Sequence, residues 1–426
     1  MNLLSNTLRQ PQQLVDIMLC MRLARMLVII VFIVLLVLLL YQIPYVQYHV
    51  GWRLDAARAY LRGVIDPVSA VPTALPAEGF VITATTSLQT TSTTASQTAT
   101  PLPTSTQFPS TIALPAPEWE EQDWNNCGPA TLAMYLRYYG WEGDQFDISN
   151  KLRTERNDRN INVEELDHYV RNNAGWLNII YRVAGDIQML KNLLANGIPV
   201  MIEEGDTIDG TYWPDDDHWA GHYLLLTGYD DSSQSFTGQD SFRGPDRQVS
   251  YSETDARWQA FNRVYIVVFH PTQEETVKNV LGEQWDSDHN RQYALEFSQA
   301  ETEAEPENAF AWFNLGTNLV FFERYAEAAQ AYDTARGLDL PQRMFRYQFG
   351  PFFAYFHSNR LEDLQILIDY ALRITENSEE AWLWRGWALY RQGDEAGAVA
   401  AFRESYRLNP LSVDAQYALE FMGASP

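Results

Sequence analysis

A stretch without a single charged residue divides this sequence into parts that must fold separately. Residues 83–117 consist mainly of threonine, serine and proline, and they contain no Asp, Glu, Lys or Arg. A segment of this composition has too little apolar surface to offset the conformational entropy that folding removes. We therefore expect an extended, disordered stalk over residues 83–117 that is open to glycosylation, with the folded domains after it.

An apolar run lies before the stalk. It is uninterrupted from Met26 to Tyr41 and continues to Val46, which approaches the roughly 20 residues that a helix needs to cross a bilayer. The run is too long for the apolar core of a typical signal peptide, and no small-residue cleavage site follows it. The sequence thus predicts a retained transmembrane anchor. The expected N-terminal segments are a tail over 1–25, a single transmembrane helix over 26–46 and a juxtamembrane segment over 47–82.

Positive charges around the run indicate its orientation. Arg22 and Arg25 adjoin the run on its N-terminal side, whereas Arg53, Arg58 and Arg62 lie farther away on the other side. The positive-inside rule then places the N-terminus in the cytoplasm. A stalk that holds a domain away from a membrane agrees with this orientation. We predict a single-pass protein of a bacterial cell membrane whose folded domains lie outside the cytoplasm.

Cys127 is predicted to stand at the start of a helix. Asn125 or Asn126 precedes it as a capping residue, apolar residues follow at helical spacing, and Gly140 supplies the stop. Unpaired N–H groups and the positive end of the helix dipole favour the thiolate, which is the nucleophilic form. The alternative is an inert residue, because free cysteines are often buried. Since the only other cysteine, Cys20, lies beside the apolar run, we interpret Cys127 as a reactive thiol.

A histidine and an aspartate are expected on two neighbouring strands. Residues 221–229 form an apolar run bounded by glycines, which is typical of a buried strand, and a pair of aspartates after it indicates a turn. Residues 235–240 predict the returning strand, so a hairpin would bring Asp240 towards His222. The histidine would serve as base to the thiol, and the carboxylate would accept its other N–H. Each residue alone also suits a structural role, as a core histidine or a turn residue.

Four sequence blocks, in order, resemble cysteine peptidase family thirty-nine. Its members are papain-like proteins related to the double-glycine leader peptidases of bacteriocin exporters, and this sequence is most similar to the stand-alone, C39-like branch. The blocks are Gln122–Ala130, Gly197–Ile202, Gly221–Asp230 and Gln239–Ser241. The resemblance covers about residues 117–270 and implies an α+β papain-like peptidase domain, which we place at 118–272, with no cofactor. It implies these roles: nucleophile Cys127, base His222, orienting carboxylate Asp240 and, with the Cys127 backbone N–H, oxyanion donor Gln122.

The sequence departs from the family pattern at several points. Gln122 lies five positions before Cys127, one fewer than in papain, and Glu121 occupies the papain spacing, where a carboxylate would oppose an oxyanion. His218 is the competing base, but it precedes the strand on a polar loop. The sequence contains neither the ATPase nor the transmembrane domain of the exporters. Cleavage after a double glycine is therefore not implied.

Charge excludes one class of partner. The formal net charge of -25 at pH 7 argues against binding of nucleic acid, which requires a basic surface. Carboxylates gather between residues 203 and 217, and carboxylate oxygens are ligands that calcium prefers. Their spacing matches no calcium motif, so we expect a solvated acidic loop and predict no metal. The carboxylates concerned are Glu203, Glu204, Asp206, Asp209 and Asp215 to Asp217.

The last third of the sequence carries a repeated pattern. Ala311–Gly316 and Ala381–Gly386 each place a tryptophan and a glycine on a first helix, and small and aromatic residues follow on a second. The pattern resembles the tetratricopeptide repeat of about 34 residues. We therefore predict an all-α repeat solenoid over 273–426 that binds a peptide or protein partner. The other expected units are a degenerate repeat near 345–378 and flanking helices over 291–304 and 412–422.

The combined prediction is a membrane-anchored cysteine peptidase. It would hydrolyse peptide bonds through a Cys-His-Asp thiolate mechanism, and its repeats would bind the substrate or a second protein. One rival is an amidase or a transpeptidase-type acyltransferase that uses the same cysteine. The other is a non-catalytic, repeat-based scaffold in which the papain-like domain only binds.

Overall fold

The computed structural model describes residues 9–43, 108–152, 161–207 and 218–426, with isolated positions between 46 and 65. The described residues belong to two units, of which the first contains α1 (Arg9–Tyr41) and the second contains everything from residue 108 onward. Most of the predicted juxtamembrane segment and the stalk up to residue 107 lie outside the described residues.

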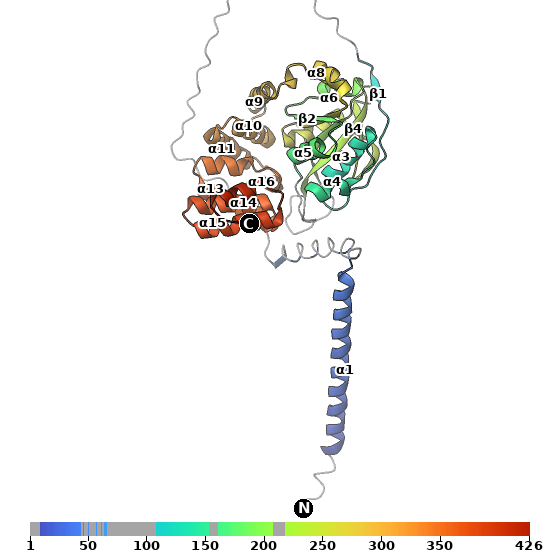
Figure 1. Ribbon diagram of the computed structural model, residues 1–426, viewed down its shortest axis with the longest axis vertical. Coiled ribbons are helices and arrows are strands. Elements are labelled where there is room, and N and C mark those ends of the chain that lie inside the picture. Colours follow the sequence, from blue (N-terminus) through green and yellow to red (C-terminus); the bar gives the residue numbers. More distant parts are fainter. Residues whose placement is uncertain are drawn as a thin grey trace, which may run out of the picture. The chain divides into compact units, whose positions relative to one another are not determined.

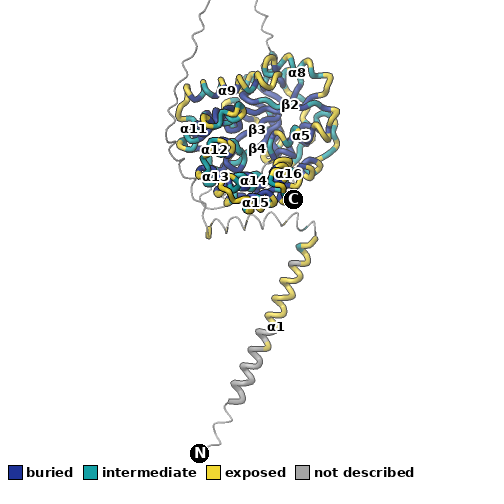
Figure 2. The backbone as a smooth tube through the Cα atoms, turned by 60° about the vertical axis from the view of Figure 1, so that its left-hand side comes forward, coloured by how far each residue is buried: buried dark blue, intermediate teal, exposed yellow. Residues whose placement is uncertain are grey.

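The first unit bears on the predicted transmembrane helix. The described side chains of α1 from Arg25 to Val37 are exposed (Figure 2). Within the described ranges, no helix has both the length and the apolar character needed to cross a membrane. This finding does not support the transmembrane helix expected over 26–46, and the extracytoplasmic location stays a prediction.

One antiparallel sheet organises the second unit (Figure 1). Its central strands are buried along almost their whole length, as expected for a sheet that is covered on both faces. The returning strand predicted over 235–240 is confirmed, and the strand predicted over 221–229 begins two residues earlier. In spatial order the strands are β2 (Asn178–Arg182), β7 (Tyr265–Phe269), β3 (Val200–Thr207), β4 (Trp219–Asp230), β5 (Ser235–Asp240) and β6 (Gly244–Ser250).

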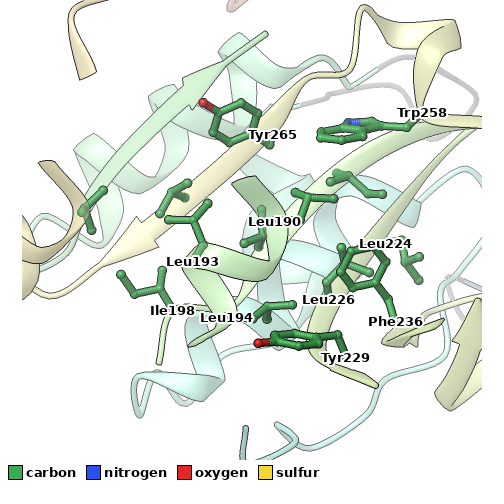
Figure 3. Close-up of a cluster of buried hydrophobic side chains, with 14 of the residues drawn as sticks. Leu190, Leu193, Leu194, Ile198, Leu224, Leu226, Tyr229, Phe236, Trp258 and Tyr265 are labelled. Atoms are coloured by element: carbon green, nitrogen blue, oxygen red, sulfur yellow. The ribbon is translucent and has the colours of Figure 1, made fainter. Parts of the chain in front are cut away.

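Helices cover both faces of this sheet. α6 (Ile187–Ala195), α7 (Tyr251–Trp258) and α8 (Glu274–Leu281) supply leucines, a tryptophan and a valine to the main core cluster, where Leu224 of β4 lies (Figure 3). The next residue back along β4, Tyr223, points the other way and its ring contacts Gly128 of α3. α3 (Cys127–Tyr138) therefore covers the opposite face, together with α4 (Gln145–Leu152) and α5 (Val163–Asn173).

A short strand lies within the predicted stalk. β1 (Thr111–Ala113) pairs antiparallel with the last residues of β4, and Ile112 and Leu114 pack against the main core cluster. The disordered stalk expected up to residue 117 is corrected at this end. Two apolar side chains and the pairing with β4 supply the stabilisation that the composition of this segment does not suggest.

The sheet together with the helices that cover it forms the sheet domain. This domain also extends past residue 272. Val277 and Leu281 of α8 are fully buried in the main core cluster, and Trp285 packs against it. The repeat domain predicted to begin at 273 is therefore corrected at its start. In space, α8 belongs to the sheet.

We call the helices from α9 to α16 the helical region. This region confirms the predicted pairs of helices. α10 (Ala309–Phe321) pairs with α11 (Tyr325–Arg336), and α14 (Glu379–Arg391) pairs with α15 (Glu395–Leu408) (Figure 1). The glycine of the repeated pattern allows this close packing: a Cβ on Gly386 would lie 2.3 Å from the ring of Phe402. The remaining helices are α9 (Ser287–Ala304), α12 (Gly350–His357), α13 (Leu361–Ile374) and α16 (Val413–Phe421), with the 3-10 helix η4 (Gln342–Arg346) before α12.

Candidate active site

Cys127 is the first residue of α3, as predicted. It is half-buried and forms no disulfide. The expected side-chain cap is absent, because the Asn126 amide is turned inward and its Nδ2 donates to Oε1 of Gln145 at 2.7 Å. The thiol thus stands at a helix start whose preceding residue is held by the protein interior.

Gln145 holds the segment that leads to the nucleophile. Besides Asn126, its Oε1 accepts from the backbone N–H of Asp123 at 2.7 Å, and its Nε2 donates to Oε1 of Glu120 at 2.9 Å and to the carbonyl of Glu121 at 2.8 Å. One buried amide therefore positions four residues before Cys127. The sequence analysis missed Gln145, because no local pattern links a glutamine in α4 to the start of α3.

The structure brings Cys127, His222 and Asp240 together. His222 Nε2 lies 2.9 Å from Oδ1 of Asp240, and both side chains are buried. Cys127 lies near enough to the His222 ring to help raise its pKa. Because Nε2 faces Asp240, Nδ1 is the ring nitrogen that remains for the thiol. The hairpin of β4 and β5 produces this arrangement by returning Asp240 to the level of His222.

The Asp240 carboxylate has hydrogen-bond donors on both oxygens. Oδ1 accepts from His222 and from the backbone N–H groups of Phe242 and Arg243, each at 2.9 Å. Oδ2 accepts from Nη1 of Arg247 at 2.9 Å. Burial raises the pKa of Asp240, but the bonds from His222 and the backbone outweigh burial and hold the pKa well below its usual range. The carboxylate is therefore ionised at neutral pH.

Arg247 is a second residue that the sequence analysis missed. It lies on β6, where an arginine on a polar strand gives no sign of a buried partner. Its guanidinium joins Asp240 to Glu253, which also pairs with Arg257 at 3.0 Å. Arg257 in turn pairs with Asp206 of β3 at 3.1 Å. These paired side chains, which alternate between positive and negative charge, connect β3, β6 and α7 around the Asp240 carboxylate.

The charge on His222 follows from its partners. Burial alone would lower the pKa of the ring, but the hydrogen bonds with Asp240 and Cys127 raise the pKa of His222 to about 10. At neutral pH the imidazole is therefore a cation, although it is buried. A cation next to the sulfur stabilises a thiolate, and an anion on the far side keeps the ring in orientation.

This arrangement makes the protonation of His222 testable. In an NMR titration we expect the ring to remain protonated through pH 8 and to lose its proton near pH 10. In Asp240→Asn the midpoint is expected to fall by at least about one unit, because a neutral amide no longer favours the charged ring. A His222 midpoint near 6.5 in the unmodified protein would contradict the arrangement.

Gln122 lies at the edge of the same site. Its backbone N–H donates to the carbonyl of Ser241 at 2.9 Å, and its Oε1 accepts from Oγ of Ser241 at 2.9 Å. Since Ser241 follows Asp240, these bonds tie the segment before Cys127 to the end of β5. With Oε1 engaged, Nε2 is the end of the amide that can donate to an oxyanion. The oxyanion role itself stays a prediction.

The competing residues lie elsewhere. Glu121 has an exposed side chain, and its carbonyl is the group that binds Gln145. His218 has a left-handed backbone with φ 58° and precedes β4, whereas the bond to Asp240 belongs to His222. One exposed aromatic does adjoin the base: the Phe242 ring meets the His222 ring edge-on at 6.5 Å and is 54 % exposed.

The described carboxylates of the acidic segment, Glu203, Glu204 and Asp206, lie on β3. Burial raises the pKa of Glu203 well above its usual range, and burial also raises the pKa of Glu204. Asp206 pairs with Arg243 at 2.6 Å and with Arg257. In the described part of the chain, no cluster of three or more His, Cys, Asp or Glu could hold a metal ion. Asp209 and residues 215–217 lie outside it.

Comparison with known families confirms the two resemblances. Residues 107–266 match the Peptidase C39-like family, and residues 379–412 match the tetratricopeptide repeat. The chain thus contains a C39-like peptidase domain and a tetratricopeptide repeat. The first match includes β1. Comparison with curated proteins finds no match to this chain.

The solved structures that are similar to part of this chain include the following three. A putative C39-like peptidase from Bacillus anthracis is 16 % identical, with 37 % of this chain and 96 % of that chain covered and a TM-score of 0.29. A double glycine motif protease from an AMS/PCAT transporter, in complex with the leader peptide, is 17 % identical, with 37 % and 94 % covered and a TM-score of 0.28. A MamA RS-1 ArsTM double mutant is 15 % identical, with 32 % and 74 % covered and a TM-score of 0.28.

Proposed function

We propose that this protein hydrolyses peptide bonds with Cys127 as the nucleophile. The observation that carries the proposal is the buried bond between His222 and Asp240, together with the effect of the neighbouring Cys127 on the pKa of His222. A buried imidazolium between a thiol and a hydrogen-bonded carboxylate suits nucleophilic catalysis, because it stabilises a thiolate and can donate a proton. The match to the C39-like family supports the same reaction class.

The first half of the reaction forms a thioester. The Cys127 thiolate attacks the carbonyl carbon of the scissile bond, and the carbonyl oxygen becomes an oxyanion. The backbone N–H of Cys127 and Nε2 of Gln122 are the proposed donors to this oxyanion. The protonated His222 then gives its Nδ1 proton to the leaving amine as the carbon–nitrogen bond breaks.

The second half returns the enzyme to its starting state. Neutral His222 accepts a proton from a water molecule, whose oxygen attacks the thioester carbon. Collapse of this intermediate breaks the carbon–sulfur bond and releases the carboxylic acid, so the thiolate and the imidazolium are restored. Asp240 keeps the same ring orientation through both halves, because its carboxylate is itself held by Arg247 and two backbone N–H groups.

The helical region is proposed to bind a peptide or protein. The match to the tetratricopeptide repeat supports this role, since stacked helix pairs of this kind form extended concave surfaces. The bound molecule would be either the substrate or a second protein that brings the substrate to the sheet domain.

The test is incubation of the protein with a mixed peptide library, followed by mass spectrometry of the products. We expect new peptide fragments with the unmodified protein and none with Cys127→Ala. An added amine should leave the products unchanged. Identical products from both proteins would disprove the peptidase function, and amine-capped products would replace hydrolysis with acyl transfer.

A further inference from the structure

Several contacts between the helical region and the sheet domain gather on one turn. The turn comprises the 3-10 helix η1 (Gln259–Phe261) and the residue after it, Asn262. Asn262 Nδ2 donates to Oδ1 of Asn318 at 2.8 Å, and Asn318 Nδ2 donates back at 3.3 Å; both side chains are buried. Asn314 Nδ2 donates to the carbonyl of Gln259 at 2.9 Å. Buried, reciprocal amide bonds are satisfied in only one arrangement of their partners.

Two further contacts fix the same turn. Arg263 Nη1 pairs with Oε1 of Glu301 in α9 at 2.8 Å, and both side chains are largely buried. Gln348 Nε2 donates to the carbonyl of Ala260 at 2.9 Å. α9, α10 and the segment after η4 thus all bind the turn. The helical region is therefore held to the sheet domain as one body around η1.

An aromatic stack continues from this turn to the candidate active site. The ring of Phe261 stacks on Trp219, the first residue of β4, at 5.6 Å between centroids. Tyr347 of the helical region meets Trp219 edge-on at 5.5 Å. Trp219 is only 7 % exposed, so its ring is buried where Phe261 and Tyr347 meet it.

The stack ends one residue from the base. A Cβ on Gly221 would lie 2.9 Å from Cζ of Phe261 and 3.3 Å from Cδ1 of Tyr347, so both rings rest directly on this backbone. Gly221 precedes His222 in β4. A glycine is needed here because the two rings occupy the space of a side chain.

The strand needs this support because its neighbours are incomplete. β3 pairs with β4 from Trp219 onward, but the described pairing of β5 with β4 begins only at Leu225. The stretch that carries His222 therefore has a strand partner on one side only. Packing by Phe261 and Tyr347 supplies restraint that a second strand would otherwise provide.

We propose that Tyr347 of the helical region is a positioning residue for His222. It acts through Trp219 and Gly221, and it keeps the imidazole in line with Cys127 and Asp240. The inference rests on the proposed function, and it adds a role for the helical region that does not depend on any bound partner. A displacement of the base by about 1 Å can lower the rate about 100-fold.

The test compares three full-length variants. Tyr347→Ala removes the ring, Tyr347→Phe keeps it, and Tyr417→Ala removes a tyrosine of α16 that is 61 % exposed. We expect Tyr347→Ala to lower kcat for a cleaved peptide about 10- to 100-fold with little change in KM, and to slow alkylation of Cys127 below neutral pH. Tyr347→Phe and Tyr417→Ala should stay within about threefold of the unmodified protein.

Several outcomes would overturn the inference. Unchanged kcat and alkylation in a folded Tyr347→Ala protein would show that the ring does not position the base. A raised KM with unchanged kcat would make Tyr347 a substrate contact instead. If Tyr347→Ala fails to fold, Gly221→Ala displaces the same rings from the other side and must give the same loss. If the unmodified protein cleaves nothing, the peptidase proposal fails, while the alkylation rates still decide the role of Tyr347.

Discussion

The variants Cys127→Ala, His222→Ala and the double variant are each expected to lose peptide hydrolysis by about 10⁴-fold or more, and to similar extents. The reason is that the thiol and the imidazole work as one unit. Once either is missing, the remaining group has no proton to exchange with its partner, so a second deletion removes nothing further. The measurement is kcat/KM for a cleaved peptide in the three proteins.

His222→Ala also allows a test of the thiol itself. Cys127 remains in this variant, and its alkylation below neutral pH is expected to become slow because the adjacent imidazolium is gone. The matched control is His218→Ala, which removes the competing histidine and should leave both hydrolysis and alkylation near those of the unmodified protein. Equal alkylation of Cys127 in the unmodified and His222→Ala proteins would show that the two groups do not interact.

Asp240→Ala is expected to lower the free energy of unfolding of the sheet domain by about 3–5 kcal/mol and to abolish hydrolysis. The deletion leaves the His222 ring and the Arg247 guanidinium without the anion between them, and breaking a buried charge network by removing one partner has an effect of this size. Urea unfolding followed by tryptophan fluorescence measures the loss.

Two control variants separate charge from shape. Asp240→Asn keeps the size of the side chain and should retain more stability than Asp240→Ala, while hydrolysis still falls by about 100-fold or more because the ring loses its orienting anion. Arg247→Met leaves three of the donors to Asp240 in place, so its effects on stability and hydrolysis should be smaller than those of Asp240→Ala. If Asp240→Ala is as stable as the unmodified protein, the buried charge network is not a source of stability.

Most elements that hold the candidate site could be predicted from the sequence. The helix start at Cys127 and the strand 235–240 are set by local patterns of apolar and polar residues, which bury one face of a helix or strand. The helix pairs of the last third follow from a repeated spacing of glycine and aromatic residues. Such patterns act over a few residues, so they can be read without knowing the fold.

Contacts between distant segments could not be predicted in this way. No spacing links Gln145 to the segment before Cys127, because these residues meet only after α3 and α4 have packed together. Arg247 reaches Asp240 only through the register in which β5 and β6 pair. The strand β1 has the same explanation. Ile112 and Leu114 are apolar residues in a Thr- and Pro-rich segment, and their value for stability depends on the core against which they pack.

The sequence by itself determined the chemistry that is available: a thiol at a helix start, a histidine and an aspartate on neighbouring strands, and a helical repeat after them. The tertiary structure alone decided which of these groups meet and what holds them, including the arginine behind Asp240 and the tyrosine of the helical region beside Gly221. The physical reason is the distance along the chain over which each interaction acts. Backbone preferences and hydrophobic periodicity are properties of neighbours along the chain, whereas burial, hydrogen bonding and charge depend on neighbours in space.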